Sequence, residues 1–160
     1  MPQTVASSRE QQPALSGCTC SKLRRLTRRV TAVYDRALAV AGLRVTQYSL
    51  LAQLRRSRGT PVSQLAEALD MDRTTLTRNL KPLLQAGWVA VEASSADARI
   101  RVVRITPAGD AHWQAARSHW RRAQAEINSA IGEPDLAELH DMLDRCLPLF
   151  RAASGEGETE

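Results

Sequence analysis

Two cysteines one residue apart precede a run of arginines near the start of the sequence. Cys18 and Cys20 lie in SGCTCSKLRRLTRRV, far in sequence from the third cysteine, Cys146. A thiol at a helix N-terminus beside basic side chains is stabilised as its thiolate and therefore reacts with oxidants. The pair could sense oxidants, hold a metal ion with a third ligand, or serve only as buried or incidental small side chains.

A metal site would need a third ligand, for which Cys146, His112 and His119 are the candidates. The two histidines are seven residues apart in sequence, too far for ligands on adjacent helical turns. We therefore predict no metal site and no cofactor, and keep a metal-thiolate-responsive protein only as an alternative. A disulfide framework is disfavoured, because three is an odd number of cysteines and the close pair cannot bridge comfortably.

The charge of the chain is unevenly distributed. Residues 21–108 contain 16 Lys and Arg against 6 Asp and Glu, whereas residues 133–160 contain 2 against 8. The basic segment favours a polyanionic partner such as nucleic acid. No apolar run approaches the length of about 18 residues that a membrane span needs, and residues 1–16 lack the features of a signal peptide. We expect a cytoplasmic protein with no membrane partner.

Apolar periodicity and capping residues predict six helices and a hairpin. The expected helices are 22–41, 47–57 capped by Thr46, 63–70 capped by Ser63, 73–86 capped by Asp72, 107–131 after Thr106, and a last helix opened by Pro134. Between them, a short edge strand is expected at 61–62, and strands at 88–92 and 99–105 surround a polar turn.

Helices 63–70 and 73–86 are separated by a short turn, the spacing of a helix-turn-helix, and the hairpin follows directly. The predicted fold class is mainly α with a small β-hairpin wing. Its winged helix-turn-helix core spans 46–105, the terminal helices at 18–45 and 106–150 form a dimerisation layer, and residues 1–17 and 151–160 are disordered tails. Apolar stripes on the terminal helices lack a cover within the chain, so a second copy is the expected cover.

The outward face of helix 73–86 carries short hydroxyls and cations. Such a helix fits the major groove, where Arg contacts guanine and Thr contacts a thymine methyl or a phosphate. At the hairpin tip, an arginine next to a carboxylate could enter the narrow minor groove. The predicted DNA-contacting residues are Ser63, Gln64, Arg73, Thr74, Thr75, Thr77, Arg78, Lys81, Asp97, Arg99 and Arg101.

Three stretches resemble the MarR family of winged-helix transcription regulators: VSQLAEALDMDRTTLTRNLKPLLQAGWV, the Asp97-x-Arg99 pattern at the hairpin tip, and ITPAGDAHW before the long helix. The resemblance covers residues 20–150, approximately. It implies a homodimer in which the first helix and the last two helices interdigitate, a pseudo-palindromic double-stranded DNA operator, and Arg99 in the minor groove. The expected function is a sequence-specific regulator, in the first place a repressor.

The resemblance also suggests two kinds of effector. The branch of the family that senses organic hydroperoxides carries its reactive cysteine near the start of the first helix, hydrogen-bonded to tyrosines. Cys20 and Tyr34 resemble such a pair, so Cys18, Cys20 and Tyr34 are candidate sensor residues. Their separation of 14 residues spans about 21 Å of helix, so they could meet only across a dimer. Family members often bind small aromatic anions, for which the candidate pocket residues are Arg44, Tyr48 and Trp113.

Other function classes fit the sequence less well. An enzyme is disfavoured because the chain has no glycine-rich phosphate loop, no nucleophile elbow and no HExxH motif. A winged-helix module that binds protein or RNA remains the alternative. RNA binding would favour exposed aromatic side chains for stacking, and the proposed nucleic-acid face has none.

Overall fold

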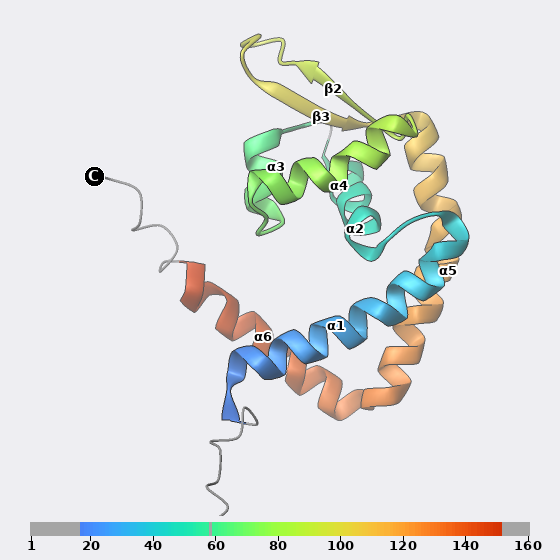
Figure 1. The fold of residues 1–160 in the computed structure, drawn as a ribbon, viewed down its shortest axis with the longest axis vertical. Helices are drawn as coiled ribbons and strands as arrows, with labels where there is room; N and C mark the ends of the chain where they lie inside the picture. The colour runs from blue at the N-terminus through green and yellow to red at the C-terminus, as the bar shows by residue number, and fades with distance from the viewer. Residues whose placement is uncertain (1–16, 58, 152–160) are drawn as a thin grey trace, which may run out of the picture.

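A computed structural model describes residues 17–57 and 59–151 (Figure 1). The predicted tails lie outside these residues, apart from Gly17 and Arg151. Within the described residues, no helix is long and apolar enough to cross a membrane. The elements in chain order are α1 (Thr19–Leu38), η2 (Ala39–Ala41), α2 (Val45–Arg56), β1 (Thr60–Pro61), α3 (Val62–Ala68), α4 (Arg73–Gln85), β2 (Val89–Ala93), β3 (Arg101–Ile105), α5 (Pro107–Ile131) and α6 (Glu133–Arg151).

The three strands form one antiparallel sheet in the order β1-β3-β2. Val103 of β3 lies opposite Thr60 on one side and Val91 on the other, so the short strand β1 forms one edge. The predicted fold class is confirmed: a mainly helical chain with a hairpin wing and an added edge strand. Strand β3 begins at Arg101, two residues later than predicted, which leaves Arg99 and Ile100 in the turn.

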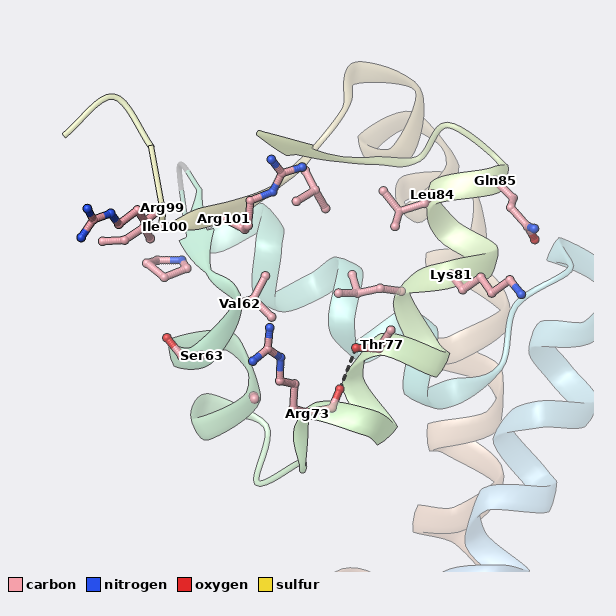
Figure 2. Close-up of a pocket in the computed structure, with 14 residues that line it drawn as sticks. Val62, Ser63, Arg73, Thr77, Lys81, Leu84, Gln85, Arg99, Ile100 and Arg101 are labelled. Atoms are coloured by element: carbon pink, nitrogen blue, oxygen red, sulfur yellow. Dashed lines mark hydrogen bonds between the residues drawn. The ribbon is translucent and has the colours of Figure 1, made fainter. Parts of the chain in front are cut away.

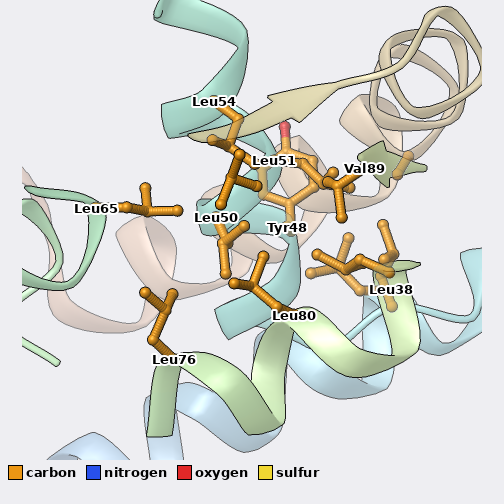
Figure 3. Close-up of a cluster of buried hydrophobic side chains, with 13 residues drawn as sticks. Leu38, Tyr48, Leu50, Leu51, Leu54, Leu65, Leu76, Leu80 and Val89 are labelled. Carbon is orange, nitrogen blue, oxygen red and sulfur yellow. The ribbon is translucent and has the colours of Figure 1, made fainter. Parts of the chain in front are cut away.

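Leucines build the centre of the core (Figure 3). The completely buried leucines come from α1, α2, α3 and α4, and Val103 of β3 packs with them. The leucines that are 0% exposed are Leu38, Leu50, Leu51, Leu54, Leu65, Leu76 and Leu83. Burying one such side chain stabilises a fold by roughly 1.5–3 kcal/mol. The helix-turn-helix and the sheet are therefore held together within one chain.

Two predicted helix caps are confirmed. The Asp72 carboxylate accepts a hydrogen bond of 2.8 Å from the amide of Thr75 and so caps α4. The Thr106 hydroxyl accepts one of 3.0 Å from the amide of Gly109 and caps α5. A Cβ atom at Gly109 would lie 2.0 Å from the carbonyl oxygen of Trp88, so only glycine lets α5 approach the base of the wing this closely.

Two other predicted caps are wrong. Helix α2 begins at Val45, one residue before the expected cap Thr46, and the amide of Val45 donates to the Asp35 carboxylate of α1 at 2.7 Å. Helix α3 begins at Val62, so Ser63 lies inside the helix, and Pro61 occupies the cap position without a side-chain hydrogen bond. At the start of α2, the Asp35 carboxylate of α1 thus accepts a hydrogen bond in place of the expected acceptor, the Thr46 hydroxyl.

Helix α5 runs from the sheet at one end to α6 at the other, and it packs against α1 along the way (Figure 1). Tyr34 of α1 donates a hydrogen bond to Gln124 of α5, and Arg36 pairs with Glu126 at 2.7 Å. Helix α6 buries little of its predicted apolar stripe: Leu143 is 36% exposed and Leu147 56% exposed.

Candidate nucleic-acid interface

Exposed side chains of α4 account for five of the eleven predicted DNA-contacting residues. Its leucines Leu76, Leu80 and Leu83 are buried, which turns the opposite face toward solvent. The exposed side chains on that face are Arg73, Thr74, Thr77, Arg78 and Lys81.

Thr75, which is also predicted to contact DNA, takes part in the helix cap. Thr75 is half-buried. Its hydroxyl donates to Asp72 Oδ2 at 2.6 Å, and its amide donates to Asp72 Oδ1. These two hydrogen bonds, the hydroxyl first, hold the pKa of Asp72 below its ordinary value. The Thr77 hydroxyl donates to the carbonyl of Arg73 at 2.7 Å, yet Thr77 remains exposed (Figure 2).

A groove of about 900 Å³ separates α4 from the wing (Figure 2). Its floor is apolar and includes Val62, Leu80 and Val91, contributed by α3, α4 and β2. Four cationic side chains line it, and no Asp or Glu is among its lining residues: Arg73 and Lys81 come from α4, and Arg99 and Arg101 from the wing. The groove therefore presents positive charge around an apolar floor, as the sugar-phosphate backbone of a nucleic acid requires.

The wing tip is braced by backbone hydrogen bonds. The amide of Arg99 donates to Asp97 Oδ1 at 2.9 Å, and the amide of Ile100 donates to the Asp97 carbonyl at 3.0 Å. The amide of Ser94 donates to the carbonyl of Ile100 at 2.8 Å and closes the turn. Asp97 thus holds the backbone of the tip, while the side chain of Arg99 is exposed.

The two residues of α3 that are predicted to contact DNA differ in whether they line the groove. Ser63 lines the groove, whereas Gln64 is exposed on the same helix but is not among the residues that line the groove.

Three exposed residues that line the groove were not predicted from the sequence: Leu84, Gln85 and Ile100. Leu84 is 41% exposed and Ile100 is 42% exposed. A signal existed for Leu84: adjacent residues on a helix point about 100° apart, so Leu83 and Leu84 cannot both face the core. No such signal existed for Ile100, because the sequence predicts a strand at 99–105.

The structure places the candidate sensor residues apart. Cys18 is the cap residue of α1 and Cys20 lies in its first turn, and all three cysteines are exposed in the chain. A hollow of about 350 Å³ beside the pair is lined also by Ser21, Arg24 and Arg28. Tyr34 is half-buried against α5, where burial raises its pKa. Among the described residues, no three His, Cys, Asp or Glu side chains are grouped so that they could hold a metal ion.

Of the three candidate residues for a ligand pocket, Trp113 lines a hollow that Arg44 and Tyr48 do not line. Tyr48 is 4% exposed and stacks on Trp113 and Trp120, with ring centroids 5.4 and 5.9 Å apart, so it belongs to the core. Burial raises the pKa of Tyr48, against the opposing effect of nearby arginines. Arg44 is exposed at the start of α2.

A hollow of about 480 Å³ lies beside Trp113 on the side of Arg55, and Ala52, Arg56 and Asp110 complete its lining. The Arg55 guanidinium lies 4.7 Å from the centroid of the Trp113 ring and also pairs with Asp110. The hydrogen bonds from Arg55 and then Gln114 lower the pKa of Asp110. The indole nitrogen of Trp113 is buried without a hydrogen-bond partner in the described chain.

The helix-turn-helix, the braced wing and the cationic groove between them define the class of winged helix-turn-helix proteins. Residues 43–100 match the MarR family. The HTH-type transcriptional regulator PecS of Dickeya dadantii is 31% identical over 125 residues, which cover 73% of this chain and 75% of PecS. The chain belongs to the MarR family of transcriptional regulators.

Solved structures agree with this assignment. The M. tuberculosis transcriptional regulator MosR, in complex with DNA, is 38% identical with a TM-score of 0.67, covering 81% of this chain and 98% of MosR. A mutant of MarR from E. coli, complexed with operator DNA, has a TM-score of 0.74 and 21% identity over 81% of this chain and 93% of MarR, which supports the fold alone.

Proposed function

We propose that this protein is a homodimeric regulator that binds a pseudo-palindromic DNA operator in a sequence-specific way and acts as a repressor. The observation that carries the proposal is the groove between α4 and the wing, which has four cationic lining residues and no acidic one. The exposed face of α4 enters the major groove, and Arg99 at the braced wing tip enters the adjacent minor groove. The DNA-bound state of MosR supports the same use of the fold.

Dimerisation is supported by apolar side chains that the single chain leaves exposed. They lie on α1 and α6, as Leu23 at 46%, Leu26 at 41%, Met142 at 47% and Leu147 at 56% exposure. A second copy covers these faces, so that residues 18–45 and 106–150 form the dimerisation layer and 46–105 the DNA-binding domain. Two-fold symmetry then presents the α4 helices about 34 Å apart, which matches half-sites one helical turn apart.

Two effectors are compatible with the chain. Oxidation of Cys18 or Cys20 is supported by their exposure and by the hollow beside them, which Arg24 and Arg28 also line. A small aromatic anion is supported by the hollow in which Arg55 and Arg56 lie beside Trp113. In either case the effector acts by releasing the protein from its operator.

The DNA-binding proposal is tested by selecting duplexes from a randomised library and measuring the affinity of wild type, Arg78→Ala and Arg122→Ala. Arg78 is exposed on α4, whereas Arg122 is an exposed arginine of α5 and serves as the matched control. Arg78→Ala is expected to lose about 1–3 kcal/mol for the selected duplex and little for random DNA. Binding to single-stranded RNA but to no duplex would instead favour the RNA-binding alternative, and binding to no nucleic acid would favour the protein-interaction alternative.

The effector proposal is tested by measuring affinity for the selected duplex before and after treatment with an organic hydroperoxide. The three proteins compared are wild type, Cys20→Ser and Cys146→Ser. Release by peroxide that disappears in Cys20→Ser but not in Cys146→Ser would identify the sensor. Binding that is indifferent to peroxide in the wild type would exclude thiol control. A titration with salicylate as the aromatic anion would then test the hollow beside Trp113, with Arg55→Ala as the variant expected to lose the response.

A further inference from the structure

Asn79 lies in the middle of α4, between the outward Arg78 and the buried Leu80. Asparagine is a poor residue for a helix interior, because its side chain competes for backbone hydrogen bonds. Here the side chain is half-buried and both ends of its amide are used. Its oxygen accepts a hydrogen bond of 2.9 Å from the Thr46 hydroxyl, and its nitrogen donates one of 2.9 Å to the carbonyl of Thr75.

Together with a hydrogen bond of the neighbouring residue Val45, the bond from Thr46 connects three helices. Asp35 of α1 accepts from the amide of Val45 at 2.7 Å, and the next residue, Thr46, donates to Asn79 of α4. The first turn of α2 is thus held by α1 on one side and holds α4 on the other. Thr46 is free for this contact because it does not cap its own helix.

The remaining contact between α2 and α4 is made largely by leucines, including Leu50, Leu76 and Leu80. Apolar contacts have no directional preference and tolerate small rotations and translations of one helix along another. A hydrogen bond between two half-buried polar side chains is directional, and one polar contact in an apolar interface can select a single register. The bond between Thr46 and Asn79 therefore selects one setting of α4 against α2.

We propose that Thr46 and Asn79 are positioning residues that fix the orientation of the DNA-reading helix α4 relative to α1, and thereby the half-site spacing that the dimer accepts. The inference rests on the proposed function. Neither residue belongs to the exposed face of α4, which carries Arg73, Thr74 and Arg78. Their effect on DNA is exerted through the angle at which that face is presented.

The test uses the full chain and the duplex selected from the randomised library. Affinity is measured for this duplex with its native spacing, for versions with one central base pair added or removed, and for a single half-site. Thr46→Val removes the hydroxyl at nearly constant volume, whereas Thr46→Ser keeps it. Asn79→Ala breaks the same bond from α4. Thr60→Val is the matched control, because the Thr60 hydroxyl donates to Ser57 at 2.6 Å without connecting α2 to α4.

Wild type is expected to prefer the native spacing over both altered spacings. Thr46→Val and Asn79→Ala should each reduce this preference by about fivefold, the effect of one lost hydrogen bond. The double variant should lose no more than Asn79→Ala alone, because that substitution already removes the bond to Thr46 as well as the one to the Thr75 carbonyl. Thr46→Ser and Thr60→Val should keep the wild-type preference, and affinity for the single half-site should not change in any variant.

An unchanged spacing preference in Thr46→Val and Asn79→Ala would overturn the inference. An equal loss on the single half-site and on the full duplex would also overturn it, since the two residues would then only stabilise the domain. Failure of the proposed function is distinguishable from both outcomes, because the wild-type protein would then select no palindromic duplex at all.

Discussion

The winged helix and the terminal helices use the same side chain, leucine, in opposite ways. In α2, α3 and α4 the leucines of the core are 0–5% exposed within one chain, whereas Leu23, Leu26 and Leu147 on the terminal helices are 41–56% exposed. The first region is complete as it stands and presents its charge outward. The second is incomplete, and its apolar faces are what a second copy would cover. We therefore expect the core of the winged helix to stabilise the fold of the single chain, and the terminal helices to stabilise the proposed dimer.

The largest effect is expected in the complete region. Leu76→Ala removes a side chain that is 0% exposed and should lower the free energy of unfolding by about 3 kcal/mol, from lost burial and the cavity left behind. The measurement is urea denaturation followed by circular dichroism. Thr74→Ala, an exposed position of the same helix, should change it by less than about 0.5 kcal/mol. Equal losses in both variants would show that α4 is not held by its leucines.

A charge on α6 should break assembly and leave the fold intact. In the proposed dimer, Leu147→Glu would place a carboxylate on both faces of the two-fold interface, so this dimer should dissociate at protein concentrations at least about a hundredfold higher than for wild type. Analytical ultracentrifugation measures this constant.

The matched control for that variant is Leu84→Glu, whose leucine is 41% exposed but lies in the groove of the other region. It should remain dimeric and lose affinity for DNA. A Leu147→Glu protein as dimeric as Leu84→Glu would show that α6 does not contribute to assembly.

A smaller effect is expected at the wing tip. Arg99→Ala should weaken binding by about tenfold where the sequence beside the half-site is A·T-rich, because a narrow minor groove attracts a guanidinium group. Affinity is compared on duplexes that differ only in A·T or G·C flanks. Arg104→Ala provides the control, since Arg104 pairs with Glu92 on the sheet at 3.5 Å and does not line the groove. Equal losses on both flanks would place Arg99 on phosphate alone.

The smallest effect concerns the cap of α4. The folded pKa of Asp72 lies below the unfolded value of about 3.9, so its stabilising contribution is complete above that value and is lost as pH falls through the folded one. Asp72→Asn still caps the helix but does not titrate. The difference in free energy of unfolding between the two proteins should be constant above about pH 5 and should shift in favour of the variant in acid. A constant difference down to pH 2 would exclude the cap as the titrating contact.

Local signals in the sequence predicted local structure well. Asp72 and Thr106 were expected as caps and are caps, because each side chain reaches an amide only three residues ahead. Thr46 was misassigned because Asp35, ten residues before Val45, supplies the acceptor instead. No local pattern contains that contact.

The same limit applies to the candidate sites. Helical periodicity predicted the outward position of Thr74, Arg78 and Lys81 on α4, and Lys81 lines the groove. The position of Arg55 over Trp113 could not be predicted, because it depends on how α2 packs on α5, 58 residues later in the chain. Pockets between distant elements require the tertiary structure.

The length of α5 has a mechanical consequence. Its 25 residues make a rod of about 37 Å, capped beside the wing at one end and joined to α6 at the other. A tilt of about 5° at one end of such a rod displaces the other end by about 3 Å, nearly the rise of about 3.4 Å between successive base pairs. If the chain acts as the proposed dimer, an effector bound near α1 and α6 would need to move α5 by only a few degrees to bring the two α4 helices out of register with the proposed operator.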